Sequence, residues 1–424
     1  MIIAQQNFMF RHRDFGLFWL GMLLIGIAAQ IQSVTIGWQI YTVARETRSI
    51  EQSAFLVGMV GLAEFLPLFV LSLWAGSMAD RHSRLAIVLI SLGVEALCLL
   101  GLVAVALETA PNFNHIFAIA AVFGAARAFL SPAASALVPM LVPKSDMPQA
   151  ISLKSMSWQV AVIVGPSIGG LLCAISTAVS FATAAGLLIS GMAIMLFMRT
   201  NTTPIRQPGS QLQHIREGLA YTWSNKIVFG AISLDLFAVL LGGATALLPA
   251  FASDILNVGS EGFGILRSAT AVGGVTMALI LVRWPLKRHA GTRMFWAVAA
   301  FGVATIVFGL SKNMWLSVAA LAFLGAADMI SVYVRQTLVQ IVTPDHMRGR
   351  VSSVSGLFIS GSNELGEFES GVVSRLIGPV AAAVFGGVGT IIVTGSWAWM
   401  FPDLRRADRL DGADQPQDHS ATVL

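Results

Sequence analysis

The sequence predicts an all-α membrane protein of twelve transmembrane helices, arranged as two pseudo-symmetric six-helix bundles. Of its 424 residues, 56% are hydrophobic and only 11% are charged, and the mean hydropathy is +0.76. This composition is too apolar for a water-soluble protein with a charged surface. The apolar residues fall into long runs, and the two halves of the chain contain stretches that resemble each other, so the runs predict the helices and the repeat predicts their grouping.

Each apolar run has about 18–26 residues, the length that an α-helix needs to cross a bilayer. We expect spans at 15–41, 54–79, 85–107, 116–142, 147–172, 174–198, 226–252, 259–282, 294–311, 314–341, 350–375 and 377–401. Several spans contain a proline, which is tolerated where neighbouring groups satisfy the freed carbonyl oxygens. The first run follows a polar leader without a signal-peptide cleavage pattern, so we interpret it as a retained span.

Lysine and arginine are distributed unevenly among the connections. With the N-terminus inside, most of the 26 basic residues lie on the cytoplasmic side, and the opposite side holds only Arg45, Arg48, Lys312 and Arg375. Because basic residues accumulate in cytoplasmic loops, both termini are expected in the cytoplasm. We expect the plasma membrane as the location, which is the inner membrane in a Gram-negative bacterium. The net charge of +4 is explained by this topology and does not indicate nucleic-acid binding.

Residues 123–170 are echoed by residues 324–371, at an offset that stays at 200 or 201. The matched glycines are Gly124 with Gly325, Gly165 with Gly366, and Gly170 with Gly371. A period of about half the chain is too long for a solenoid, so it indicates two homologous halves related by a pseudo-two-fold axis.

The longest connection separates the sixth span from the seventh. It is rich in Pro, Thr and Gln and ends in a short amphipathic piece, HIREGLAYTW. We therefore expect an N-terminal six-helix bundle at 1–200, a cytoplasmic linker at 201–225 and a C-terminal six-helix bundle at 226–402. The polar tail at 403–424 is expected to be disordered and cytoplasmic.

The loop between the second and third spans reads GSMADRHSR from Gly76 to Arg84. It resembles the signature loop of the major facilitator superfamily, with Met and Ser at the usual Leu and second Gly. The resemblance implies that this loop latches the cytoplasmic side of the protein in the outward-open state. Glycine allows close helix packing, the acid accepts hydrogen bonds from a helix N-terminus, and the arginines hold partners across the domain interface. The expected cytoplasmic gate is Gly76, Asp80, Arg81 and Arg84.

The fifth span contains the sequence GPSIGG. It resembles the core of the antiporter motif in exporters of the same superfamily, although the upstream glycines of the longer pattern are missing. Glycines allow tight helix packing and proline bends the helix, which together limit leakage through the cavity. The motif residues are Gly165, Pro166, Gly169 and Gly170.

Two further stretches, 127–143 and 340–351, resemble the branch of the superfamily that includes enterobactin exporters and macrolide efflux proteins. The first carries an arginine followed by Ser-Pro, and the second a glutamine followed by T-P-x-x-x-R-G-R. The resemblance extends through nearly the whole chain and identifies a branch but not a substrate.

Ionisable residues near the middle of a span cost about 2.5–3.5 kcal/mol or more unless they face a partner or water. Those near mid-span are Glu64, Glu95, Arg127, Asp235, Asp328 and Glu364. In the superfamily fold, spans one, four, seven and ten line the cavity, which implies that Arg127, Asp235 and Asp328 surround it. Gln30 and Gln32 on the first span would join Arg127 in contacting substrate.

A proton-coupled exporter needs buried acids that change protonation between its two openings. Asp235 and Asp328 are the first candidates, followed by Glu64 and Glu364. A structural alternative is an ion pair between Arg127 and Asp328, which occupy equivalent positions in the repeat. The two roles are compatible if the pair breaks during turnover.

The remaining charges within spans have simpler interpretations. Glu367 and Glu369 are expected to approach the outer surface near Arg375, and Lys154 and Arg335 to snorkel or pair near the cytoplasmic ends. Cys98 and Cys173 lie inside apolar spans and show no metal-ligand spacing. No phosphate-binding loop or protease motif occurs in its required context, so we expect neither an enzyme nor a cofactor or metal.

The sequence thus predicts export of a small amphipathic molecule by proton-coupled alternating access. A siderophore of the enterobactin type is the leading substrate. Multidrug or macrolide antiport is the alternative, because an acid-rich tier suits a cation. A non-transporting receptor or scaffold of the same fold is a third reading, against which the buried charges argue. The expected partners are the substrate, protons and lipid, and the chain is expected to be monomeric.

Overall fold

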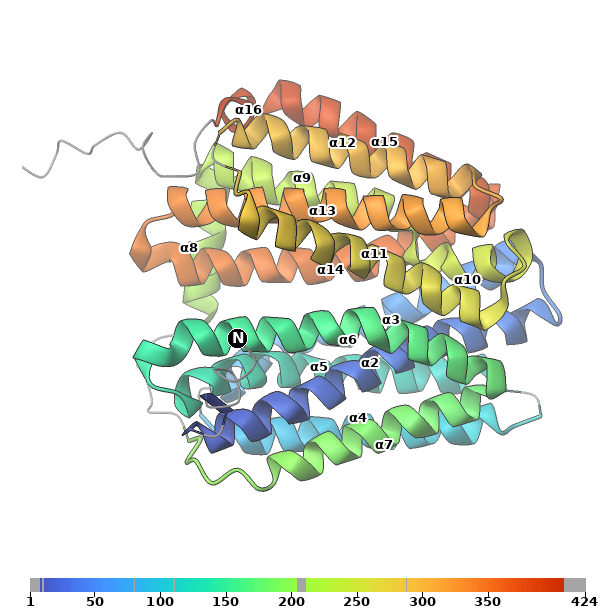
Figure 1. The fold of residues 1–424 in the computed structure, drawn as a ribbon, viewed down its shortest axis with the longest axis horizontal. Helices are drawn as coiled ribbons and strands as arrows, with labels where there is room; N and C mark the ends of the chain where they lie inside the picture. The colour runs from blue at the N-terminus through green and yellow to red at the C-terminus, as the bar shows by residue number, and fades with distance from the viewer. Residues whose placement is uncertain are drawn as a thin grey trace, which may run out of the picture.

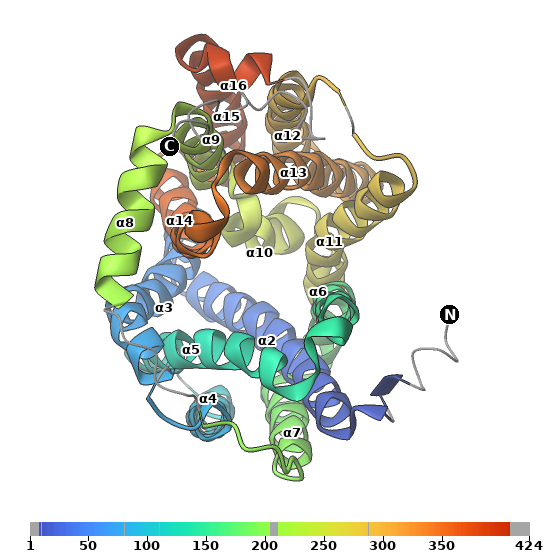
Figure 2. The ribbon, with the colours of Figure 1, turned by 90° about the vertical axis from the view of Figure 1, so that its left-hand side faces the viewer.

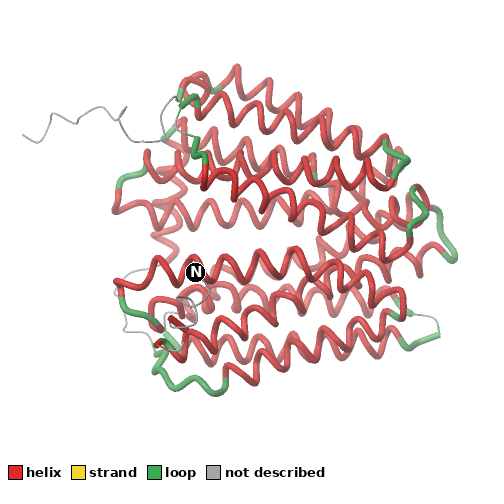
Figure 3. The backbone as a smooth tube through the Cα atoms, in the orientation of Figure 1, coloured by secondary structure: helices red, strands yellow, loops and turns green. Residues whose placement is uncertain are grey.

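The computed structural model describes residues 8–9, 11–79, 81–109, 111–203, 211–286 and 288–407. Its described part consists of helices and loops without strands (Figure 3). The helices form two groups that run side by side, joined by one short helix that lies across them (Figure 1). This arrangement confirms the predicted all-α fold.

The first bundle contains six membrane-length helices, whose bounds agree with the predicted spans to within a few residues. They are α2 (Arg13–Arg45), α3 (Ile50–Ala79), α4 (Arg84–Ala106), α5 (Phe113–Leu141), α6 (Met147–Ile175) and α7 (Thr177–Met195), with a short 3₁₀ turn, η1 (Lys144–Asp146), before α6. Helix α8 (Gln211–Ser224) follows and packs against α14 of the second bundle.

The second bundle begins with a broken span and continues with five long helices. The broken span consists of α9 (Lys226–Gly242), a 3₁₀ turn η2 (Ala244–Leu247), α10 (Leu248–Ala250) and a π-helical segment η3 (Phe251–Ile255). The others are α11 (Gly259–Arg283), α12 (Ala290–Leu310), α13 (Met314–Val342), α14 (Asp345–Ile377) and α15 (Pro379–Met400), followed by the short α16 (Pro402–Arg406). The break falls at Gly242-Gly243 and before Pro249, where helix propensity is lowest.

Eleven segments of the described residues are long and apolar enough to cross a membrane. The predicted span that is not among them, 350–375, corresponds to α14, a helix of 33 residues. This helix is long enough to cross, but it carries Glu364, Glu367 and Glu369 within one stretch. Its low hydropathy therefore reflects what it faces, as the site below shows.

One end of the molecule carries the basic residues Arg13, Arg84, Lys144 and Arg405, and we name it the basic end. It lies at the left of Figure 1 and faces the viewer in Figure 2. The opposite end carries the connections 46–49, 107–109 and 256–258. Seen from the basic end, α10 lies in the centre, between the helices of the two bundles (Figure 2).

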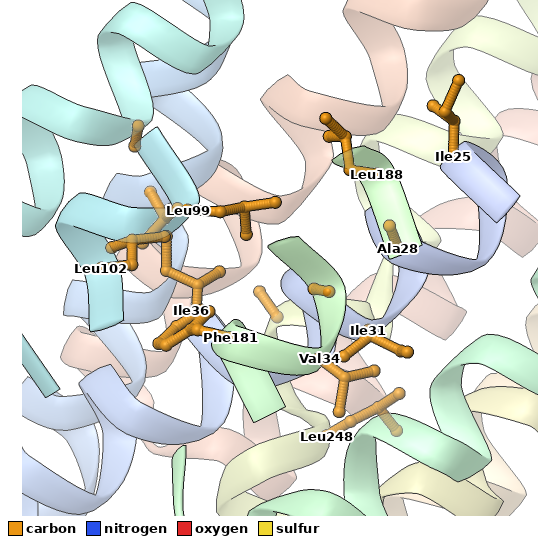
Figure 4. Packing of buried hydrophobic residues seen from close by; sticks show 14 of the residues in the cluster. Ile25, Ala28, Ile31, Val34, Ile36, Leu99, Leu102, Phe181, Leu188 and Leu248 are labelled. Carbon is orange, nitrogen blue, oxygen red and sulfur yellow. The ribbon is translucent and has the colours of Figure 1, made fainter. Parts of the chain in front are cut away.

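Buried aliphatic and aromatic side chains hold each bundle together. In the first bundle, α2, α4 and α7 contribute residues such as Ile31, Leu99 and Phe181, which are at most 1% exposed (Figure 4). Leu248 of α10 belongs to the same cluster and packs near Val34 of α2, so the cluster continues into the second bundle. Packing between helices supplies most of the fixed geometry, because lipid is as apolar as the side chains.

The matched glycines of the repeat occupy equivalent places in the two bundles. A Cβ atom at Gly124 of α5 would overlap the backbone of α3 at Glu64, and one at Gly325 of α13 would overlap the backbone of α11 at Thr270. Gly165 approaches α2 at Ile27 and Gln30, and its counterpart Gly366 approaches α9 at Val239 and Leu240. The contacts thus follow the pseudo-symmetry that the repeat predicts.

Gly170 and Gly371 face the other bundle. Gly170 of α6 packs on Gly264 of α11, and Gly371 of α14 packs on Gly58 of α3. We call these two contact lines the glycine seams. Because small residues let helix backbones approach closely, backbone packing joins the bundles along the two seams.

The expected disordered tail needs a correction at its start. Residues 403–406 belong to α16, and Leu404 is fully buried against α12. The Gly291 N–H also donates to the Ala407 carbonyl oxygen at 2.9 Å. The buried Leu404 side chain and the hydrogen bond from Gly291 both hold this turn against α12. The rest of the expected tail, 408–424, lies outside the described residues.

The close approach at Gly124 yields a test of the packing. Gly124→Ala should lower the free energy of unfolding by about 1–3 kcal/mol, because the new methyl group meets backbone that has no room to move. Gly186→Ala on α7 is the matched control, since nothing lies within 4 Å of its Cβ position. Thermal unfolding in detergent measures both. Equal midpoints for the two variants would contradict the described packing of α5 on α3.

Candidate functional site

A cavity of about 410 Å³ lies between the two bundles, at the middle depth of the helices. Helices α2, α3 and α5 form one wall, and the broken span with α11, α13 and α14 forms the other. Its volume falls in the range of small-molecule sites. Its ionisable lining residues are Glu64, Arg127, Arg267, Asp328, Glu364 and Glu367.

The structure places two of the three expected substrate residues in the cavity wall. Arg127 and Gln30 line the cavity. Gln32 does not line it, because it lies two residues from Gln30 on α2 and points into the bundle, where it is 1% exposed. Neither oxygen nor nitrogen of its amide has a hydrogen-bond partner among the described residues.

Arg127 pairs within its own bundle. Its Nη1 atom lies 3.3 Å from Oε2 of Glu64, and its guanidinium group lies 5.1 Å from the centre of the Phe123 ring. The expected alternative, an ion pair between Arg127 and Asp328 across the cavity, is wrong for the described conformation. Glu64 lies on α3, which packs directly against α5 and therefore reaches Arg127 first.

Arg267 of α11 is a cavity residue that the sequence analysis left unassigned. Its Nη2 atom donates to Ser33 Oγ of α2 at 2.9 Å, so the hydrogen bond joins the two bundles. Among the described residues, Arg267 makes no salt bridge. The signal available in the sequence was an arginine inside the eighth span, where a charge is costly.

Three carboxyl groups of the cavity, those of Asp328, Glu364 and Glu367, form no salt bridge with a described residue. Glu364 and Glu367 are three residues apart on α14 and so share one face of the helix. The expectation that Glu367 approaches the outer surface near Arg375 is wrong. Arg375 instead stacks over the Phe55 ring at 4.8 Å.

A second charge cluster lies inside the C-terminal bundle. Asp235 Oδ2 and Arg335 Nη2 are 3.2 Å apart, and the two residues are 6% and 2% exposed. Arg335 was expected either to snorkel or to pair, and in the structure it pairs with Asp235. Asp235 does not line the main cavity, but a small pocket beside it is lined by Asp235, Asp328 and Ser331. Asp328 therefore faces both the cavity and the buried ion pair.

The loop of the expected cytoplasmic gate is only partly described. Gly76 is buried at the end of α3, and Arg81 is exposed in the following turn. Arg84 Nη1 donates to the Ala136 carbonyl oxygen of α5 at 2.6 Å, which is a contact inside the first bundle and not the expected contact across the interface. Asp80 lies outside the described residues.

The GPSIGG sequence lies where α6 meets α2 and α11. Gly165 and Gly169 face α2, while Gly170 and the Pro166 carbonyl oxygen face Gly264 of α11. Ser167 and Ser268 add a hydroxyl hydrogen bond of 2.9 Å at the same seam. The tight packing expected for these residues is therefore present, both within the bundle and between bundles.

Comparison with known proteins shows the family to which this chain is related. The model of a family described as transmembrane secretion effector, within the major facilitator superfamily, matches residues 7–421. The enterobactin exporter EntS of Shigella boydii is 25% identical over 391 residues, which cover 91% of this chain and 89% of that protein.

Solved structures agree at the level of the fold. A POT family transporter in complex with 5-aminolevulinic acid gives a TM-score of 0.73 at 12% identity, covering 92% of this chain and 96% of that one. A D-xylose-proton symporter gives 0.71 at 13% identity, covering 94% and 98%.

The buried ion pair can be tested by substitution. Asp235→Asn should destabilise the protein by about 3–5 kcal/mol, because it leaves the Arg335 charge buried without a counter-charge. The double variant Asp235→Asn with Arg335→Gln should lose less than the sum of the two single variants. Thermal unfolding of the four proteins gives the coupling energy. Additive losses would show that the two groups do not stabilise each other.

Proposed function

The chain belongs to the transmembrane secretion effector family of the major facilitator superfamily, and from this premise we propose that it exports a small amphipathic molecule by alternating access. It is a multi-pass membrane transporter and not an enzyme. The observation that carries the proposal is the central cavity, whose walls and charges come from both bundles. A site shared in this way changes its accessibility when the bundles rock against each other.

The two bundles, 1–200 and 226–402, are the proposed moving units, and residues 201–225 connect them. The glycine seams support this division, because they allow the bundles to slide and part without breaking strong bonds. Both termini are proposed to be cytoplasmic, so that the basic end faces the cytoplasm as the charge distribution requires. The protein is proposed to act as a monomer in the plasma membrane.

A siderophore of the enterobactin type is the leading substrate. The relatives named as enterobactin exporters support it, since they match over nine-tenths of the chain. Arg267 supports it as well, because its guanidinium group faces the cavity and forms no salt bridge with a described carboxylate. A catecholate oxygen is a suitable acceptor for it.

Multidrug efflux of cations is the second candidate, and a specific observation favours it. Four carboxyl groups line the cavity against two arginines, and Arg127 is already paired with Glu64. When they are ionised, the remaining carboxylates attract an organic cation. The third reading, a scaffold without transport, predicts no substrate binding to this cavity at all.

Proton coupling is proposed to use the carboxyl groups that have no salt bridge. Asp328 and Glu364 line the cavity, and Asp328 also faces the buried Asp235. A carboxyl group in such surroundings can exchange a proton when water reaches it from one side. Glu64 and Asp235 are proposed to join the exchange only when their arginine partners move.

Expression in a bacterial strain that lacks its own enterobactin exporter tests the substrate. Catecholate should return to the medium under iron starvation, and Arg267→Gln should reduce the secretion at least tenfold, because the anionic oxygen loses its charged donor. Arg283→Gln on the same helix is the control, since Arg283 stacks on Trp284 away from the cavity. Resistance to macrolides or lipophilic cations, without catecholate secretion, would favour the second candidate.

Proton flux in inverted vesicles tests the coupling. With tetraphenylphosphonium as the cationic probe, its uptake should release protons from the vesicle lumen. Asp328→Asn and Glu364→Gln should each abolish this flux, because an amide cannot exchange the proton, and neither change removes a salt bridge. Asp403→Asn at the basic end is the control. Flux that persists in both cavity variants would contradict the assignment of these acids.

A further inference from the structure

Beyond the cavity, at the opposite end of the molecule, one polar cluster joins the two bundles. The Tyr41 hydroxyl group of α2 donates to Asp254 Oδ2 of η3 at 2.6 Å. Arg45, one helical turn further along α2, donates to the same carboxylate from Nη2 at 3.0 Å and from Nε at 3.2 Å. We infer that Tyr41, Arg45 and Asp254 form an exit lock, which holds this end of the cavity closed and must open before substrate leaves.

The two sides of the lock are rigidly presented. Tyr41 is fully buried, and Arg45 is fixed by a further hydrogen bond from Nη1 to the Arg48 carbonyl oxygen at 2.6 Å. Three donor contacts to one carboxylate define a single arrangement of the bundles. Such a cluster favours the closed state and contributes nothing once α2 and η3 separate.

Asp254 is held by an unusual piece of backbone. It lies in η3, the π-helical end of the broken seventh span, whose Phe251 carbonyl oxygen accepts the Leu256 N–H at 2.7 Å. Asn257 follows with a φ of 54°, in the left-handed region. π-Helical turns are rare and are often found at functional sites. Here the turn directs the Asp254 carboxylate toward α2.

The exit lock lies next to the part of the cavity wall that faces this end of the molecule, which we call the roof of the cavity. Phe263 of α11 lines the cavity and stacks on Trp38 of α2, with ring centres 5.9 Å apart and planes at 23°. Trp38 is one turn before Tyr41 on α2. Separation of Asp254 from α2 would therefore also release the helix face that carries the roof.

Because the cluster is partly exposed to water, it can open and form again. The side chains of Arg45 and Asp254 are 32% and 19% exposed, so both charges reach water when the bundles part. A fully buried pair such as Asp235 with Arg335 would cost far more to open. The described hydrogen bonds of Arg267 with Ser33 and of Ser167 with Ser268 also join the bundles, but each involves a neutral hydroxyl group. The exit lock instead pairs opposite charges that reach water when the bundles part, which suits a cycle of closing and opening.

The inference rests on the proposed alternating access and is tested without substrate. In a background with Cys98→Ala and Cys173→Ala, Thr245→Cys places a thiol in the cavity wall near the opposite end. A membrane-impermeant thiosulfonate added to intact cells should label it slowly. Asp254→Asn or Arg45→Gln should raise the labelling rate roughly tenfold, because losing charge-assisted hydrogen bonds shifts the population toward the open exit.

Glu46→Gln is the matched control, because it removes an exposed charge next to Arg45 without touching Asp254. The exchange variant Arg45→Asp with Asp254→Arg should restore slow labelling, which a merely structural defect would not do. Ser135→Cys near the basic end verifies sidedness, since it should react only after permeabilisation.

Labelling of Asp254→Asn at the rate of Glu46→Gln, or no recovery in the exchange variant, would overturn the inference. Fast labelling in the lock variants together with absent transport of catecholates and cations would instead reject the proposed function and leave the lock standing.

Discussion

A charge inside the hydrocarbon layer must be paired or must face water, and this constraint determines most of the structure. Arg127 with Glu64 and Asp235 with Arg335 satisfy it by pairing. The other cavity charges satisfy it by facing the space between the bundles. Helix α14 therefore spans the protein despite its acids, because Glu364 and Glu367 line the cavity and do not face lipid. Glu95 is different, since one of its carboxyl oxygens is buried without a hydrogen-bond partner among the described residues.

The scaffold is symmetric where it packs and asymmetric where it carries charge. Matched glycines bring α5 onto α3 and α13 onto α11 in the same way. The charged positions do not repeat, because Arg127 in the first bundle corresponds to Asp328 in the second. In the proposed alternating access, two bundles packed in the same way move about a shared axis. Because the two bundles contribute different charges, the site between the bundles can orient a polar substrate.

Sequence reasoning predicted how far along its helix a charged residue lies, but not toward which neighbouring helix its side chain points. Counting residues from the span ends placed Arg127, Asp328 and Glu364 at the level of the cavity, and the structure lines the cavity with all three. The same count could not reveal that Glu64 lies closer to Arg127 than Asp328 does, because that depends on how each helix is rotated. Glu367 was misplaced in depth, because it was expected near the outer surface, whereas it lines the cavity together with Glu364. The helical phase within α14 relates Glu367 to Glu364 but not to the other bundle.

The broken seventh span shows a different limit. A regular helix through residues 226–255 would carry Asp254 on a face that is fixed by its distance from Asp235. The 3₁₀ turn and the π-helical segment change that phase, and neither is encoded by periodicity. Gly242-Gly243 and Pro249 indicate that the helix is interrupted, but not where the chain turns afterwards. The contact between Asp254 and α2 was therefore accessible only from the folded structure.

The acidic and basic groups of the cavity relate the charge of the substrate to the direction of proton movement in the proposed cycle. Two arginines and four carboxyl groups line the cavity, and the carboxyl groups are the ones that exchange protons in the proposed cycle. An organic cation competes with protons for these carboxylates, so its exit and proton influx exclude each other at the site, as antiport requires. An anion held by Arg267 has the opposite relation, because protonated neighbours repel it less. In the proposed proton-coupled cycle, the direction of the proton flux therefore distinguishes a cationic substrate from an anionic one.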